Sequence, residues 1–492
     1  MNVNRFYFIL LMLAVTVVSV FAQSFNWYSS TEDALWGQSS LKLSKTAANT
    51  PVLEVTEKES IVTFQSWGMT FNELGWDALN MLPRDQQEII LRQLFDPQGD
   101  LRFSIGRFAM NANDYARNWY SCSDVAGDFQ LKYFNINRDK TTLIPYIKAA
   151  QRYQPDLTCW VSPWSPPAWM KINHHYAVLS NREYNDLSYL TDHALFEGAD
   201  QKDNRVFPRQ LTVNDYFIQD PRYLTTYANL FCKFIDAYGE QNIPVSRVMF
   251  QNEAWSYTAY PGCAWTADGI IRFNVEYLAP ALKEQHPGVS LYLGTINTNR
   301  FDEIDKILAD PRMPNSIQGV GFQWEGGQIL PAIRAKYPQY KYVQTEGECG
   351  WGSFDWNAGE HTFGLINHYL GNGCEEYTIW NVILYDEGKT PWGWKQNALI
   401  RVDSQKGTAT YTPEYYAVKH YANFIAKGSK IITQKDGKDD KIKILVAQST
   451  EGKYTIVAGN FNDEDKDITV KIGERYLNAT LQPHSLNTFQ MK

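Results

Sequence analysis

Short apolar runs alternate with longer amphipathic stretches along most of this chain. After Lys58 the alternation becomes regular, and eight strand-like runs follow one another: IVTFQSWGM, LRFSIGRFAM, PDLTCWVSPW, VSRVMFQNE, VSLYLGTIN, SIQGVGFQW, YKYVQTEGE and EEYTIWNVI. Segments with helical spacing lie between them, such as RDQQEIILRQLF and YLTTYANLFCKFIDAYGE. Connections of helix length imply that consecutive strands pair in parallel. Eight such units predict an α/β fold, the (β/α)8 TIM barrel.

The pattern changes towards both ends of the chain. From about Lys430 onward, short alternating runs are broken by the polar sequences KDGKDD, STEG and NFNDED, which predicts a small antiparallel β-sandwich. The N-terminal sequences SLKLSK and PVLEVTE also read as strands, and we expect them to join the same sandwich. The predicted organisation is N-terminal sandwich strands at 23–58, a catalytic barrel at 59–425 and a C-terminal β-sandwich domain at 426–492.

The N-terminus, MNVNRFYFILLMLAVTVVSVFAQS, places an Arg before a long apolar run that ends at Ala22. This arrangement is typical of a secretory signal peptide, here residues 1–22, and an uncleaved membrane anchor is the alternative. No later segment is long and apolar enough to span a membrane. We therefore expect an exported protein, periplasmic or extracellular, with no stable membrane insertion after the signal peptide is removed.

Composition narrows the possible classes of function. The formal net charge is -8 and no basic run or stripe is present, so nothing indicates nucleic-acid binding. Core packing explains only part of the 16 Trp and 30 Tyr residues, and Trp residues in Gly- and Pro-rich loops favour a surface for flat ligands such as sugar rings. The six Cys residues show no metal-ligand spacing, and their pairing does not follow from the sequence.

Two acids stand at predicted strand ends, where TIM barrels place their chemistry. The fourth run ends in Asn252 and Glu253, and the seventh in Glu346, with Glu348 two residues further on. Strands four and seven lie nearly across the barrel mouth from each other. Glycoside cleavage needs such a pair, because one carboxylic acid protonates the leaving oxygen while a carboxylate acts on the other face of the sugar. A gap of roughly 5 Å makes the second acid a nucleophile, and a wider gap gives inversion.

Strand parity bears on the choice between Glu346 and Glu348. In an extended YKYVQTE strand, Gln344 and Glu346 share one face, and Val343 and Thr345 share the other. The Val343 face suits the helix layer, so we expect Glu346 to point into the barrel. Glu348 has the same parity but lies beyond a glycine at which the strand is expected to end. Parity alone leaves both acids open.

Other strand-end residues are candidates for binding a sugar. A Glu at such a position is more often an exposed loop acid or a salt-bridge partner, and half of the Trp residues near strand ends are expected in the core. Trp164 and Trp380 are the best candidates for stacking on a sugar, because each directly follows a strand and neighbours Pro or Asn. The full set is Glu73 after the first strand, Trp164 after the third, Gln323 and Trp324 after the sixth, and Trp380 and Asn381 after the eighth.

Six motifs, in order, resemble glycoside hydrolase family 30, the family that includes glucosylceramidases. SWGMTFNELGWDAL resembles the family's first-strand segment, SPWSPPAWMK its third-strand loop, FQNEAW its acid/base motif and QTEGECG its nucleophile motif. TIWNVIL followed by GWKQNALI resembles its eighth-strand region, and TPEYYAVKHYANFIAKGSKII resembles its return to the β domain. Each motif alone is weak, whereas six in the right order are specific.

The resemblance implies retaining hydrolysis of β-glycosides on a barrel with a side β-sandwich built from both termini. It implies that Glu253 is the acid/base and that Asn252 binds the sugar 2-hydroxyl. It implies that Glu346 is the nucleophile, since the family's acid follows Thr or Ser and lies shortly before a Cys. The remaining sugar-binding residues that it implies are Trp164, Trp380 and Glu73. No cofactor or metal is required, and the partner is a carbohydrate.

Two departures from the glucosylceramidase pattern bear on the substrate. The sixth strand carries Gln323 where those enzymes tend to have His, and the first carries FNEL rather than their Thr-Asp pattern. Both changes favour a branch of the family that cleaves polysaccharides or oligosaccharides over one that cleaves glucosylceramide. Members of that branch act on β-1,6-glucan, xylan, β-galactan or β-fucosides, and we expect β-1,6-glucan or a related β-gluco-oligosaccharide as the substrate. The alternatives are a glucosylceramidase-type enzyme and a β-xylosidase or β-fucosidase. Endo or exo action and the oligomeric state do not follow from the sequence.

Two rivals of other classes remain. A carbohydrate-binding protein on a barrel scaffold would be marked by the loss of a catalytic acid, and both acids are present. A metal-dependent barrel hydrolase would need His and Asp ligands clustered at strand ends, and the eight His residues lie mostly in predicted helices or loops.

Overall fold

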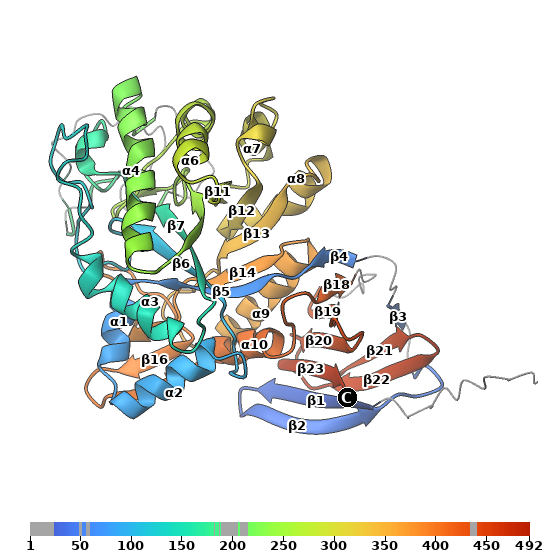
Figure 1. The fold of residues 1–492 in the computed structure, drawn as a ribbon. Helices are drawn as coiled ribbons and strands as arrows, with labels where there is room; N and C mark the ends of the chain where they lie inside the picture. Colours follow the sequence, from blue (N-terminus) through green and yellow to red (C-terminus); the bar gives the residue numbers. More distant parts are fainter. Residues whose placement is uncertain are drawn as a thin grey trace, which may run out of the picture.

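The computed structural model describes residues 24–48, 52–55, 60–181, 183–185, 187, 205–206, 215–432 and 440–492. A barrel of strands surrounded by helices lies beside a smaller all-β layer that contains both the first and the last strands of the described chain (Figure 1). The predicted signal peptide at 1–22 lies outside the described residues. No helix within these ranges combines the length and hydrophobicity needed to cross a membrane.

Eight parallel strands form the barrel, and each predicted run supplies one of them. Ladder pairing runs in chain order from the first strand to the seventh, and the eighth pairs with the first. Backbone hydrogen bonds from Gly347 N to Thr378 O and from Glu375 N to Tyr342 O join the seventh strand to the eighth. The predicted TIM barrel is therefore confirmed. The strands are β5 (Ser66–Phe71), β6 (Ile105–Met110), β7 (Thr158–Pro163), β9 (Val245–Met249), β11 (Ser290–Ile296), β12 (Gly319–Gln323), β13 (Lys341–Glu346) and β14 (Glu376–Ile379).

Amphipathic helices cover the outside of the barrel. In the longest of them, α4 (Pro221–Glu240), the residues at the N-terminus favour the start of a helix. The Asp220 side chain caps it by accepting from Arg222 N at 2.8 Å, and Pro221 occupies its first turn. Its apolar positions recur at helical spacing and are buried. The helices are α1 (Glu73–Asn80), α2 (Arg84–Phe95), α3 (Leu143–Gln151), α4 (Pro221–Glu240), α5 (Ala267–Phe273), α6 (Ala279–Gln285), α7 (Phe301–Leu308), α8 (Leu330–Lys336), α9 (Trp356–Gly371) and α10 (Pro413–Ala422).

The side β-sandwich is built from both ends of the chain, as predicted. One sheet runs in the order β2-β1-β23-β20-β19-β18-β4 and the other in the order β22-β21-β3. Antiparallel pairing of β1 with β23 joins the two ends. The members are β1 (Ser24–Thr31), β2 (Ala34–Lys42), β3 (Val52–Glu54), β4 (Ser60–Thr63), β18 (Lys430–Ile432), β19 (Ile442–Gln448), β20 (Tyr454–Asn460), β21 (Lys466–Ile472), β22 (Arg475–Leu481) and β23 (Ser485–Met491).

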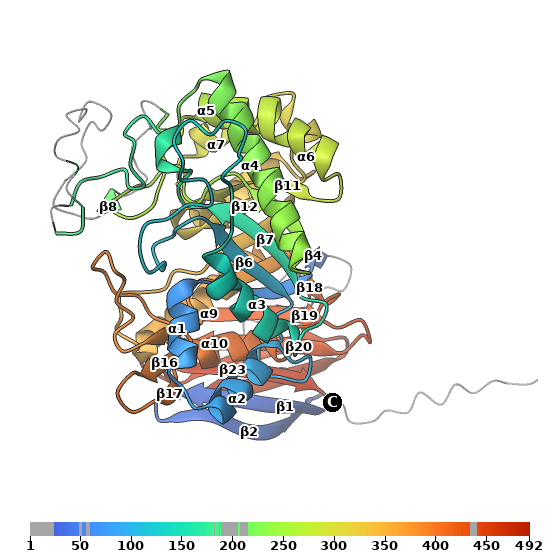
Figure 2. The same cartoon turned by 60° about the vertical axis from the view of Figure 1, so that its left-hand side comes forward.

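Helix α10 attaches the sandwich to the barrel. The buried His420 imidazole of α10 lies 2.9 Å from both the Ser30 hydroxyl of β1 and the Thr488 hydroxyl of β23. Figure 2 shows α9 and α10 between the barrel and the sandwich strands. Five short strands complete the described set around the barrel. β8 (Arg205–Val206) pairs with β10 (Tyr257–Thr258), and β15 (Ile383–Tyr385) and β17 (Thr408–Tyr411) flank β16 (Ile400–Asp403).

The interior of the barrel corrects the expectation drawn from strand parity. Val343 does not face the helix layer: it packs inside with residues of four other strands, including Met249. A register irregularity then pairs Gln323 of β12 with Glu346 and leaves Thr345 as an extra residue on β13. Because this bulge interrupts the alternation of side chains, Glu346 also turns inward. The inference about Glu346 holds, but for a different reason.

A buried ion pair joins opposite sides of the barrel near its N-terminal end. Arg247 of β9 donates to both carboxylate oxygens of Glu376 on β14, at 2.7 and 2.8 Å. We expect Arg247→Met to lower the free energy of unfolding by about 3 kcal/mol, because Glu376 is left as an unpaired buried charge. Urea denaturation measures this loss, and the double variant Arg247→Met/Glu376→Leu should recover most of it. A single variant as stable as wild type would contradict this account.

Candidate active site

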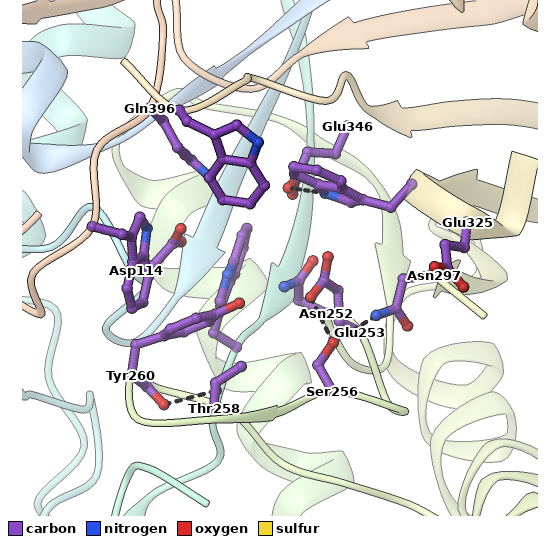
Figure 3. A pocket seen from close by; sticks show the side chains of 14 residues that line it. Asp114, Asn252, Glu253, Ser256, Thr258, Tyr260, Asn297, Glu325, Glu346 and Gln396 are labelled. Atoms are coloured by element: carbon purple, nitrogen blue, oxygen red, sulfur yellow. Dashed lines mark hydrogen bonds between the residues drawn. The ribbon is translucent and has the colours of Figure 1, made fainter. Parts of the chain in front are cut away.

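A cavity opens where the barrel strands end at their C-termini (Figure 3). The loops that follow seven of the eight barrel strands contribute to its lining, together with Glu346 at the end of β13. Four of the described lining residues carry carboxyl groups, and none is a Lys, Arg or His. The lining residues are Asp114, Trp164, Asn252, Glu253, Ser256, Thr258, Tyr260, Asn297, Trp324, Glu325, Glu346, Trp351, Trp394 and Gln396.

The carboxylate of Glu346 is held by a cation and an indole. Arg107 of β6, itself fully buried, donates to Glu346 Oε2 at 2.7 Å, and Trp324 Nε1 donates to Oε1 at 2.9 Å. Burial raises the pKa of Glu346, while the Arg107 charge and the Trp324 N–H oppose that rise. The ionised form therefore has specific stabilising partners, and both of its oxygens are fixed in position.

Glu253 lies in a different environment. Its two hydrogen-bond donors are neutral: Gln323 Nε2 donates to Oε1 at 2.9 Å and Ser256 Oγ donates to Oε2 at 2.8 Å. Burial, with a further contribution from the negative charge of Glu346, raises the pKa of Glu253 to about 7. The two acids thus lie in one cavity with environments that favour opposite protonation states.

The amide of Asn252 is oriented by the protein. Its Oδ1 accepts from Arg107 Nη2 at 2.6 Å, from Thr295 Oγ1 at 3.0 Å and from Gln323 Nε2 at 3.2 Å. These three donors use the acceptor capacity of the amide and fix which way it points. The Nδ2 group is then the donor that Asn252 offers to a ligand in the cavity.

Two residues of the cavity have strained backbones. Glu253 and Trp324 have φ angles of 50° and 47°, in the left-handed region. For a non-glycine residue this conformation costs about 1 kcal/mol or more and is concentrated at functional sites. At Glu253 the backbone N–H is held by Thr295 Oγ1 at 3.1 Å. Both side chains line the cavity, where Trp324 reaches Glu346.

The predicted sugar-binding residues divide into those that line the cavity and those that support it. Trp164 and Trp324 line it, and Gln323 reaches Glu253. Trp380 does not line it: this fully buried ring stacks behind Trp164 with centroids 5.0 Å apart. Asn381 also lies behind the lining, where its Nδ2 donates to Gln396 Oε1 at 2.8 Å.

Glu73 and Glu348 are not brought to the cavity. The side chain of Asn72 caps α1, so Glu73 belongs to the first turn of that helix, where it accepts from Arg138 at 2.7 and 2.8 Å. This ion pair holds the loop that follows β6 and corrects the expectation that Glu73 meets a sugar hydroxyl. Glu348 lies beyond the strand end and pairs with His361 at 2.8 Å. Of the two acids that parity left open, only Glu346 lines the cavity.

The strand pattern of the sequence does not predict several of the lining residues. Asp114 is 5% exposed, and burial together with the charges of Glu346 and Glu253 raises its pKa well above the usual range. It lies four residues after β6, in the polar sequence NAND. A polar sequence directly after a barrel strand could have marked Asp114 as a candidate site residue. Tyr260, Trp394 and Gln396 come from loops far beyond their strand ends, where strand pattern carries no information.

No group of three or more His, Cys, Asp or Glu side chains in the described part of the chain is placed to hold a metal ion. The chemistry that the cavity offers is that of paired carboxyl groups, amides, hydroxyls and aromatic rings. Such a set suits acid–base and nucleophilic steps on a hydroxylated, uncharged ligand.

Known proteins resemble this chain over most of its length. The model of the glycosyl hydrolase family 30 TIM-barrel domain matches residues 64–183 and 217–425. A lysosomal acid glucosylceramidase of Mus musculus is 24% identical over 441 residues, covering 84% of this chain and 78% of that protein. An endo-1,6-beta-D-glucanase of Neurospora crassa is 23% identical over 437 residues, covering 82% and 81%. The solved structure of the endo-beta1,6-glucanase BT3312 has the same fold, with a TM-score of 0.76 and 19% identity over 95% of this chain and 99% of that one.

Proposed function

Because the chain belongs to glycosyl hydrolase family 30, we propose that it is a retaining β-glycosidase that cleaves β-glucosidic linkages by double displacement. The observation that carries this proposal is the contrast between two buried acids in one cavity. Glu346 is held by a cation and an indole N–H, and Glu253 by neutral donors only. A nucleophile must be ionised and a general acid must be protonated before attack, and these environments favour that division.

In the first step, Glu253 donates its proton to the glycosidic oxygen while a Glu346 oxygen attacks the anomeric carbon. The bond from that carbon to the leaving oxygen breaks, and an ester to Glu346 forms. In the second step, Glu253, now ionised, takes a proton from a water molecule whose oxygen attacks the anomeric carbon. The ester bond breaks, and the sugar leaves with its original configuration.

Three lining residues are suited to hold the sugar. Asn252 offers its Nδ2 to a hydroxyl, because its Oδ1 is already occupied. Trp164 lines the cavity with an aromatic ring that a sugar can stack on, and Trp380 packs behind this ring. Asp114 adds a carboxyl group whose raised pKa reduces its charge and leaves it able to exchange hydrogen bonds with hydroxyls.

The substrate is proposed to be β-1,6-glucan or a related β-gluco-oligosaccharide. The support is Gln323 beside the catalytic pair, the polar lining, and the likeness to a fungal endo-1,6-beta-D-glucanase. The likeness to a glucosylceramidase favours the alternative glycolipid substrate. The apolar segment at residues 1–22 further supports export of the protein.

The test is hydrolysis by the purified protein of β-1,6-glucan, xylan, glucosylceramide and nitrophenyl β-glucoside, β-xyloside and β-fucoside. Proton NMR of the first product formed reports its anomeric configuration. Release of the β-anomer from a glucoside is the expected result. Release of the α-anomer would reject the retaining mechanism, and no hydrolysis of any substrate would reject the function.

Arg107 is expected to tune the nucleophile. Removing its charge with Arg107→Gln should lower kcat/KM roughly 10- to 100-fold, since charge-assisted hydrogen bonds to Glu346 and Asn252 are lost. The acidic limb of the pH profile should move to higher pH, because the pKa of Glu346 rises without the neighbouring cation. Arg117→Gln is the matched control, as Arg117 pairs with Asp77 outside the cavity. An equal loss in both variants, or an unmoved limb, would contradict this role.

A further inference from the structure

An aromatic contact between two lining residues stands at one end of the cavity. The rings of Tyr260 and Trp394 meet edge to face, with centroids 4.3 Å apart and planes at 61°. Tyr260 follows β9 and Trp394 follows β14, so the contact bridges loops from strands on opposite sides of the barrel. In Figure 3, Asp114, Tyr260 and Gln396 lie at this end, while Asn297 and Glu325 lie at the other.

A second layer of rings lies behind this contact. Trp392 and Trp394 form one apolar cluster with Ala112 and Ala116 of the loop after β6. Trp119 of the same loop packs against Trp392 with centroids 4.9 Å apart. Trp392 is 3% and Trp394 8% exposed. Tyr260 packs against the same cluster. We call Tyr260 and Trp394, with this backing, the aromatic wall.

The Tyr260 side of the wall is anchored by hydrogen bonds. The buried Lys171 donates from Nζ to Gly262 O at 2.6 Å, and Asn185 Nδ2 donates to Ala259 O at 2.7 Å. Thr258 Oγ1 donates to Tyr260 O at 3.1 Å. Three side chains thus hold the backbone on both sides of Tyr260, so the loop is built as a fixed part of the cavity.

The Trp394 side is equally constrained. Its carbonyl accepts from Thr390 N at 2.8 Å in a tight turn that includes Gly393. Gly393 has a φ of 98°, and a Cβ at this position would stand 1.9 Å from the Tyr184 hydroxyl oxygen. Only glycine satisfies both conditions. The turn therefore fixes where the Trp394 ring meets Tyr260.

The position of the acid indicates which end receives the leaving group. Glu253 Oε2 accepts from Ser256, and Ser256 Oγ in turn accepts from Asn297 Nδ2 at 2.6 Å. This chain of contacts runs towards the end opposite the aromatic wall. Glu253 must reach the oxygen of the leaving group. With the leaving group on this side of Glu253, the sugar that is attacked at its anomeric carbon lies on the walled side, with Asp114 and Gln396.

From this geometry we infer that the enzyme accommodates a single sugar ring between Glu346 and the aromatic wall, and therefore removes residues from the non-reducing end of its substrate. An endo-acting enzyme needs room for the substrate chain to continue beyond both sides of the bond that it cleaves, and the aromatic wall blocks one of these directions. This inference of exo action rests on the proposed glycosidase function.

The test uses the neutral β-gluco-oligosaccharide that the wild type cleaves fastest, with and without a methyl block on the non-reducing terminal sugar. Wild type should release only monosaccharide, and the block should lower kcat/KM about 100-fold or more. Release of longer products from the non-reducing end, or unchanged cleavage of the blocked substrate, would overturn the inference. Hydrolysis of nitrophenyl β-glucoside distinguishes the two proposals. If the protein hydrolyses this substrate but cuts oligosaccharides internally, or does not cut them, the glycosidase function stands and only exo action is rejected. Absence of hydrolysis of every substrate rejects both proposals.

Variants then test the wall itself. Trp394→Ala should open the blocked end and raise kcat/KM on the blocked substrate, relative to the unblocked one, about tenfold over wild type. Tyr260→Ala removes the other side of the contact and provides a second route if one variant fails to fold. Tyr133→Ala is the matched control, because Tyr133 is 56% exposed and does not line the cavity. Folded Trp394 and Tyr260 variants that keep the wild-type ratio would overturn the role of the wall.

Discussion

Glu346→Gln is expected to abolish turnover, lowering kcat by roughly 10⁴-fold or more, while the protein still folds and binds sugar. The amide keeps the volume of the carboxylate and can still contact Arg107 and Trp324, but it cannot form the glycosyl ester. Initial rates on nitrophenyl β-glucoside measure the loss, and calorimetric titration with an oligosaccharide measures the binding that remains.

The control for this variant is the same substitution at Glu348. Glu348→Gln makes the same chemical change two residues along the chain, at a side chain that pairs with His361 and does not line the cavity. We expect it to retain activity within about tenfold of wild type. If Glu346→Gln kept wild-type rates, or if Glu348→Gln suffered the larger loss, the assignment of the nucleophile would be wrong.

Glu253→Ala is expected to lower kcat by about 10²- to 10⁴-fold on substrates whose leaving group is a sugar. The loss should be much smaller with a nitrophenyl leaving group, which departs without a proton. Azide should restore turnover of the aryl glucoside, because this small anion reaches the anomeric carbon through the space left by the side chain. The carbon–nitrogen bond forms as the ester to Glu346 breaks, which gives a β-glycosyl azide. Absence of rescue, or an α-configured product, would count against Glu253 as acid/base.

The same residue predicts the alkaline limb of the pH profile. Burial raises the pKa of Glu253 to about 7, so the protonated acid is present below this pH and is lost as the pH rises through it. The value of kcat/KM for wild type should therefore fall above about pH 7. In Glu253→Ala this limb should disappear, since the titrating group is absent. A limb that persists unchanged in the variant would show that another group controls it.

Patterns that are local in the chain were enough to predict the architecture and to select Glu253 and Glu346 as the paired acids. Short apolar runs separated by segments of helix length predicted the eight strands. This works because burial of a strand or of one face of a helix determines which residues close together in the sequence are apolar. Glu253 and Glu346 could be found because a strand end is a position in the sequence, and strand ends in a barrel meet at one mouth. The pairing of both chain ends in one sandwich was predicted from the same kind of pattern.

The tertiary structure alone decided how those acids differ and what surrounds them. Arg107 lies 239 residues before Glu346 along the chain, and their hydrogen bond is what distinguishes Glu346 from Glu253. The bulge at Thr345, the ion pair of Glu73 with Arg138 and the contact of Tyr260 with Trp394 likewise depend on side chains brought together from distant segments. Local periodicity carries no record of such contacts, because they arise only when loops of different lengths pack against one another at the mouth of the barrel.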